Sequence, residues 1–74
     1  MKTDEQLLEM MEREERVLEE KANLDSKIVK LTSFLFARES IEVGWNEREI
    51  LLEQLYLMMD YSKTLLKRIY NFKI

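Results

Sequence analysis

The sequence predicts an all-α protein: an antiparallel two-helix hairpin, coiled-coil-like, with an N-terminal helical extension. Two long segments repeat apolar residues at alternating intervals of four and three, and the only glycine lies between them. The chain has no proline and 36% charged residues, a composition typical of long helices. Its 74 residues suffice for a single domain, 1–74.

The first helix is expected over residues 3–37. Thr3 and Gln6 have the spacing of a capping box, which satisfies backbone groups at a helix start. Polar residues interrupt the apolar series early, so a kink within 11–23 is allowed. The apolar series consists of Met10, Val17, Leu24, Ile28, Leu31 and Leu35.

A turn over 38–46 and a second helix over 46–71 are expected next. Asn46 is predicted as the N-cap of this helix, with Trp45 packing on Ile50 as a hydrophobic staple. The second series keeps the spacing of a left-handed helix pair without interruption. It consists of Leu51, Leu55, Met58, Ser62, Leu65, Ile69 and Phe72.

The charge pattern supports an antiparallel arrangement independently. Successive blocks carry net charges of −5 (1–20), +3 (21–38), −5 (39–60) and +4 (61–74). If Ala37 faces Glu47, the numbers of facing residues sum to about 84, and each basic block lies beside an acidic one. A parallel pair would place acid against acid.

Association with other chains is expected to stabilise so small a domain. The sequence contains no Cys and no His, which excludes disulfides and the usual zinc sites. The first helix is roughly ten residues longer than the second, about 15 Å at the rise of an α-helix. A second apolar stripe on the second helix also lacks an intrachain partner, so we expect at least a dimer. This stripe is Leu52, Met59 and Leu66.

Several functional classes are disfavoured by the composition. With no His or Cys and no glycine-rich loop, the sequence offers no catalytic motif, and no enzyme activity or cofactor is expected. We interpret Glu12, Glu15 and Glu19 as a solvated helix face, and no metal site is expected. The net charge of −3 argues against duplex nucleic acid as partner. No apolar run is long enough to span a membrane, and a cytoplasmic protein is expected.

Two pairs of residues are candidates for binding a small anion. Lys30 and Thr32 flank Leu31, so an ammonium and a hydroxyl lie beside the helix seam and could hold a phosphate. Arg16 and Arg68 can be neighbours across the hairpin. The alternatives stay open: ordinary helix surface for the first pair, and pairing with nearby acids for the second.

The polar and seam residues together resemble a family of small bacteriophage hairpin proteins. The matching segments are Arg16-Val17-x-Glu19-Glu20-Lys21, Leu24-Asp25-x-Lys27-Ile28-x-Lys30-Leu31-Thr32-x-Phe34-Leu35, Glu47-Arg48-x-x-Leu51-Leu52, Tyr61-Ser62-x-x-Leu65 and Arg68-Ile69. They are similar to the sponge proteins that counter cyclic-oligonucleotide immunity, the anti-CBASS protein two family, and to the related Thoeris anti-defence protein one. The resemblance covers roughly residues 14–70.

The resemblance implies an immune-evasion function without catalysis. Members of this family form homo-oligomers, often hexamers, and sequester cyclic di- or trinucleotides or cyclic ADP-ribose isomers in pockets between protomers. Lys30 and Thr32 match a Lys-x-Thr that contacts the dinucleotide, while Arg68 and Arg16 fall on a second nucleotide pocket. By the resemblance, Glu15 and Glu12 stand where the family has a stacking aromatic and an arginine. Either Arg13 takes over that contribution, or the ligand differs or is a cyclic trinucleotide held by the other pocket. The alternative is an oligomeric helical scaffold or adaptor that binds another protein.

Overall fold

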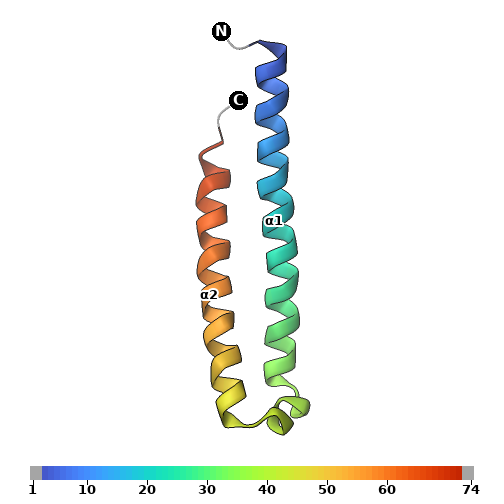
Figure 1. Ribbon diagram of the computed structural model, residues 1–74, viewed down its shortest axis with the longest axis vertical. Helices are drawn as coiled ribbons and strands as arrows, with labels where there is room; N and C mark the ends of the chain where they lie inside the picture. The colour runs from blue at the N-terminus through green and yellow to red at the C-terminus, as the bar shows by residue number, and fades with distance from the viewer. Residues whose placement is uncertain (1–2, 73–74) are drawn as a thin grey trace.

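The protein is a rod of two helices joined by a short helical turn. The computed structural model describes residues 3–72, and only the backbone of residues 38–40; residues 1–2 and 73–74 of the predicted domain lie outside the described part. Along the chain lie α1 (Asp4–Phe36), the 3₁₀ helix η1 (Arg38–Val43) and α2 (Trp45–Tyr70). The two long helices pack side by side and antiparallel (Figure 1), in a molecule of 58 × 15 × 14 Å. The all-α expectation is confirmed.

The start of α1 follows the predicted capping box. The Gln6 backbone N–H donates to Thr3 Oγ1 at 3.2 Å, and the Thr3 N–H donates to Gln6 Oε1 at 3.0 Å. Two backbone donors at the helix end are thereby satisfied. The helix then continues to Phe36 without a break, so the interruption allowed within 11–23 is not present.

The core is a thin seam between the two helices. Lys21, which interrupts the apolar series in sequence, lies between Val17 and Leu24 on the same seam, because intervals of four and three keep residues on one helix face. Leu65 is fully buried, with 0% of its surface exposed. The buried side chains are Val17, Leu35, Leu55, Ser62 and Leu65.

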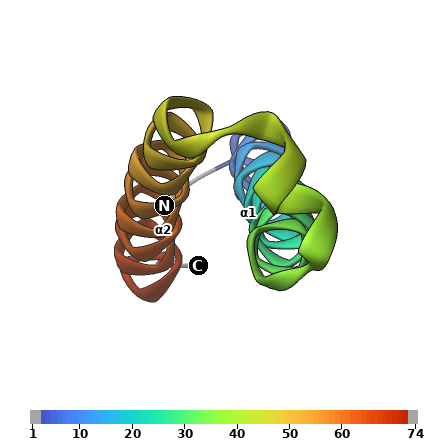
Figure 2. The same cartoon turned by 90° about the horizontal axis from the view of Figure 1, so that it is seen from below.

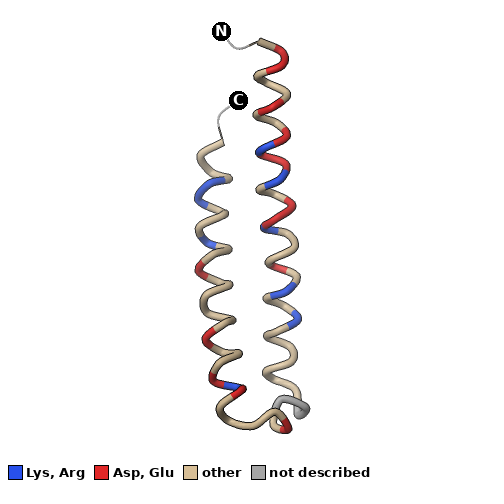
Figure 3. Tube along the Cα trace, in the orientation of Figure 1, with Lys and Arg blue, Asp and Glu red and all other residues tan. Residues whose placement is uncertain are grey.

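Two contacts across the seam fix the pairing of the helices. Lys21 Nζ donates to Ser62 Oγ, and Arg48 Nη2 donates to the Leu35 carbonyl. In both pairs the residue numbers sum to 83, close to the expected register. As Figure 3 shows, the basic end of α2 then lies beside the acidic first half of α1, and the acidic start of α2 beside the basic second half of α1.

The start of α2 differs from the expectation. Gly44 is the N-cap with φ 85°, no side chain caps the helix, and Trp45 is already its first residue. The prediction of Asn46 as N-cap was therefore wrong, because a left-handed glycine lets the chain enter the helix one residue earlier. Trp45 is 78% and Ile50 56% exposed, so the predicted staple is not formed. Figure 2 shows the turn segment bridging the two helices at this end.

Both helices carry apolar surface that one hairpin leaves uncovered. Helix α1 has 33 residues and α2 has 26, a difference of seven, about 10 Å at the rise of an α-helix. Its N-terminal end projects beyond α2 (Figure 1). The exposed large apolar residues of α2 include the predicted stripe, and we call the following set, which lies along one side of the helix, the outer face of α2: Leu52, Tyr56, Met59, Leu66 and Tyr70.

Candidate functional site

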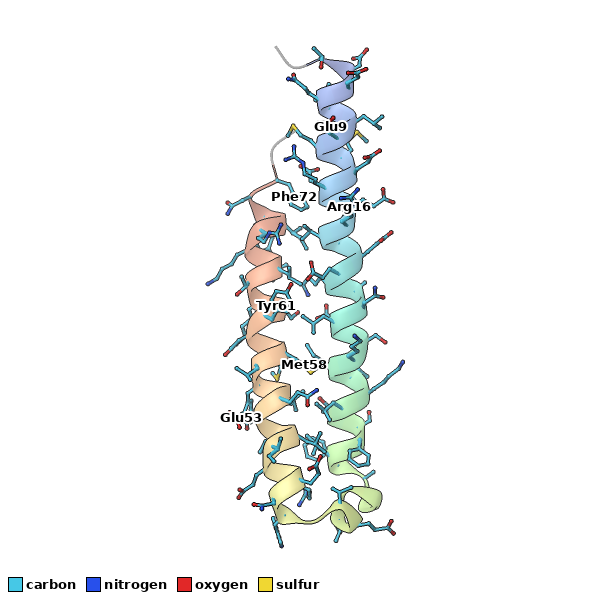
Figure 4. The ribbon with its side chains drawn as sticks, in the orientation of Figure 1. Glu9, Arg16, Glu53, Met58, Tyr61 and Phe72 are labelled. Atoms are coloured by element: carbon cyan, nitrogen blue, oxygen red, sulfur yellow. The ribbon has the colours of Figure 1, made fainter. Side chains whose placement is uncertain are left out.

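Lys30 lies beside a shallow groove between the helices, here called the Lys30 groove. The groove encloses about 400 Å³ and is lined by Lys27, Lys30, Leu31, Phe34, Leu51, Gln54 and Met58. Met58 reaches into the space between the helices (Figure 4). Two ammonium groups therefore border a mainly apolar floor, so the groove offers donors to an anion and contact area to an apolar or aromatic group.

Thr32 does not line the Lys30 groove. Residues two positions apart on an α-helix point in directions about 200° different, so Lys30 and Thr32 lie on opposite sides of the seam. Thr32 is half-buried and precedes Phe36 by one helical turn, which places it on the side of another pocket described below. A single hairpin thus does not bring the two predicted residues together.

Two arginines meet in a second groove near the free end of α2, here called the open-end groove. It encloses about 210 Å³ and is lined by Met10, Arg13, Glu14, Val17, Arg68 and Phe72. Phe72 points from the end of α2 toward α1 (Figure 4). Arg13 and Arg68 give this groove two guanidinium groups against one carboxylate, Glu14, so a small anion is favoured here.

Arg16 lies outside the open-end groove, which corrects its expected pairing with Arg68. Arg13 precedes the buried Val17 by four residues and shares its side of α1, whereas Arg16 is rotated by about 100° from Val17. Arg16 instead borders a shallow groove of about 250 Å³ with Arg13 and two carboxylates, Glu9 and Glu12. These acids weaken its attraction for a phosphate.

A polar cluster occupies the middle of the seam, between the two grooves. Lys21 Nζ donates to Asp25 Oδ2 at 2.6 Å and to Ser62 Oγ at 3.1 Å, and Ser62 Oγ donates to Asp25 Oδ1 at 2.5 Å. The hydrogen bond from Lys21, with that from Ser62, lowers the pKa of Asp25 below its ordinary value. This cluster is internally satisfied and therefore structural rather than ligand-binding.

Tyr61 forms a second polar contact across the helices. Its hydroxyl donates to Glu20 Oε1, and this hydrogen bond, with desolvation, raises the pKa of Tyr61, while the positive charge of Arg68 acts in the opposite direction. Figure 4 shows Tyr61 on the side of α2 that faces the viewer. The Tyr61 hydroxyl is thus engaged within the hairpin.

A further cavity lies near the turn, where the sequence predicted none. This turn pocket encloses about 540 Å³ and is lined by Leu35, Phe36, Trp45, Arg48, Glu49, Leu52, Leu55 and Tyr56. The guanidinium of Arg48 lies 5.4 Å from the centre of the Trp45 ring. Trp45 and Arg48 are one helical turn apart, a spacing that allows the guanidinium to lie over the ring. The sequence therefore carried a signal for this contact, but Trp45 was assigned to a staple on Ile50 instead.

The described residues contain neither a metal-binding group nor a membrane-spanning helix. Among residues 3–72, no group of three or more acidic side chains is placed to hold a metal ion. Within the same residues, neither helix is long and apolar enough to cross a bilayer. The Lys30 groove and the open-end groove combine cationic donors with apolar side chains. This combination is suited to an anion that also carries a ring.

Comparison with known proteins identifies the family. The model of the Sequestin family matches residues 11–71, a range that includes most of α1, the turn and all of α2. Neither the curated proteins nor the solved structures contain a match to the chain. Because the family model matches far more than half of the sequence, the chain belongs to the Sequestin family.

Proposed function

We propose that this protein is a sponge: it binds cyclic nucleotide signalling molecules and holds them without cleaving them. The observation that carries the proposal is membership of the Sequestin family, whose name denotes sequestration. The seam and polar residues also resemble those of bacteriophage anti-defence sponges. On this basis we propose that sequestration serves immune evasion in the cytoplasm of an infected bacterium. The ligands we propose are cyclic di- or trinucleotides, or cyclic ADP-ribose isomers.

The chemistry of two grooves supports an anionic, ring-containing ligand. Lys27 and Lys30 border one groove, and Arg13 and Arg68 border the other. Ammonium and guanidinium groups pair with phosphate oxygens, arginine in a bidentate manner. The apolar side chains between them provide contact area for bases. A cyclic nucleotide carries both kinds of group.

We further propose that the grooves are completed by neighbouring copies of the chain. Each groove is shallow and open along a single hairpin, whereas ligand pockets usually bury most of the ligand surface. The outer face of α2 is apolar and uncovered, so it can pack against another hairpin. By the resemblance, the assembly is a homo-oligomer, most often a hexamer.

A thermal-shift panel followed by calorimetry tests the proposal. A ligand that binds only the folded protein, at ~100 times its Kd, adds ~2.7 kcal/mol of stability, which is readily detected. We expect Lys30→Ala or Arg68→Ala to weaken binding of a cyclic di- or trinucleotide. Lys67→Ala is the matched control, because Lys67 is exposed and shares a face with Asp60 and Glu53. Binding unchanged in both groove variants would place the site elsewhere.

A scaffold that binds another protein is the second candidate. The exposed apolar residues of α2 favour it, since such a surface can receive a foreign helix as readily as another copy. The two candidates differ in the small-molecule experiment. An intact oligomer that binds no cyclic nucleotide would favour the scaffold.

A further inference from the structure

We propose that the turn pocket is a subsite for the purine base of a nucleotide. This inference rests on the proposed function and names a base-recognition site within it. The pocket is lined on α2 by Arg48, Leu52 and Tyr56, whereas the Lys30 groove uses Leu51, Gln54 and Met58. These two sets lie on opposite sides of the α2 seam, so the subsite is separate from the Lys30 groove.

Arg48 is held in place and keeps a free donor. Its Nη2 donates to the Leu35 carbonyl at 3.3 Å, and its guanidinium lies 5.4 Å from the centre of the Trp45 ring. Among the described residues, the Nε of Arg48 is buried and has no hydrogen-bond partner. Because a buried donor without an acceptor is costly, a rotation of the guanidinium that turns this N–H toward a ligand acceptor in the turn pocket would satisfy it.

Three aromatic side chains line the turn pocket together with Arg48. Phe36 is 88%, Trp45 78% and Tyr56 58% exposed, and all three line the turn pocket. Leu35 and Leu55 are buried and form its floor. Exposed rings beside an apolar floor are suited to stacking on a planar group, which is how aromatic side chains bind unpaired bases.

The polar residues of the pocket favour a base over a phosphate. Glu49 contributes a carboxylate to the lining, which repels a phosphate but accepts a hydrogen bond from an amino or imino group. A purine presents ring or carbonyl acceptors, which arginine recognises, and donors for a carboxylate. Its double ring also fills more of the 540 Å³ than a pyrimidine does.

The position of the pocket suits a ligand held between protomers. Leu52 belongs both to the turn pocket and to the outer face of α2. A neighbouring hairpin packed along that face would therefore lie beside the pocket and shield a bound base from water. The nucleotide's phosphates would then extend toward the neighbouring chain.

Trp45 provides a direct readout, because it is the only tryptophan in the chain. The full-length protein is titrated with GMP and AMP while Trp45 fluorescence is recorded, with ribose 5-phosphate as the probe that lacks a base. We expect a saturable change with both purine nucleotides and affinity weaker by about tenfold or more for ribose 5-phosphate. Arg48→Lys keeps the charge but lacks Nε, and Phe36→Ala removes a ring; each is expected to weaken GMP binding by about tenfold.

Lys67→Ala is the control and should bind GMP as the wild type does, while circular dichroism verifies that all variants keep their helix content. The subsite is overturned if GMP produces no saturable change, or if Arg48→Lys binds GMP unchanged. Cyclic-nucleotide calorimetry separates the two proposals. Heat of binding without any response of Trp45 overturns the subsite alone, and a GMP response without cyclic-nucleotide binding overturns the sponge alone.

Discussion

Lys21, Asp25 and Ser62 show how single polar residues determine the pairing of two apolar helices. A seam of leucines alone can slide by a heptad at little cost, since each position resembles the next. The hydrogen bonds of Lys21 and Asp25 to Ser62 are satisfied in one register only. We infer that this cluster selects the observed register, as buried polar residues do in coiled coils.

The lowered pKa of Asp25 predicts a loss of stability in acid. A carboxyl group whose pKa is lower in the folded than in the unfolded state stabilises the fold above its unfolded pKa. That contribution is expected to be complete above the ordinary value of 3.8 and to disappear as the pH falls through the lower folded value. Urea unfolding measured across this range should show the decline, and Asp25→Asn should remove this component. If the free energy of unfolding of Asp25→Asn declines equally in acid, the loss of stability comes from other carboxylates.

Gly44 determines where α2 begins. Its φ of 85° and ψ of 163° lie in a region that residues with a Cβ rarely adopt, although a Cβ there would meet no atom within 4 Å. Strain alone should therefore make Gly44→Ala destabilising, by roughly 1–3 kcal/mol. Chemical denaturation is the measurement.

Asn46→Ala is the matched control for this element. Because Asn46 caps nothing in the structure, its replacement should change the free energy of unfolding by about 0.5 kcal/mol or less. A large loss in Asn46→Ala together with a neutral Gly44→Ala would restore the asparagine cap and contradict the observed helix start.

The helices and their pairing could be predicted from the sequence because both depend on repeats that extend over many residues. The seam of α2 and the capping box at Thr3 are examples. The start of α2 could not be predicted, because asparagine is a favourable N-cap residue. Only the backbone angles of Gly44 show that the helix begins one residue before Asn46. At the site, residue numbers placed Arg16 opposite Arg68, but the direction of each side chain on α1 gives that place to Arg13.

At the scale of the whole molecule, the hairpin is a rod with more apolar surface than its seam can bury. Leu66 is 37% exposed, and it lies on the outer face of α2 beside the fully buried Leu65. We expect Leu66→Glu to leave the hairpin helical but to dissociate the proposed oligomer, because an unpaired charge buried at an interface costs several kcal/mol. Light scattering with circular dichroism measures both properties.

Lys67→Glu is the control for Leu66→Glu, since it introduces the same side chain next to it on the solvent face with Asp60 and Glu53. It should leave the oligomer intact. A wild-type protein that stays monomeric at micromolar concentration would contradict the proposed assembly and leave the outer face of α2 without a partner.

The proposed function requires the protein to capture a cyclic nucleotide and to keep it chemically intact. The most direct measurement mixes the protein in excess with a cyclic di- or trinucleotide or a cyclic ADP-ribose isomer, filters off the unbound ligand, denatures the retained protein by heat and analyses the released material by chromatography. We predict that one of these ligands is depleted from the filtrate and is recovered unchanged after denaturation. Ligands that all remain in the filtrate would contradict capture, and ligands that are recovered as linear products would contradict sequestration without cleavage.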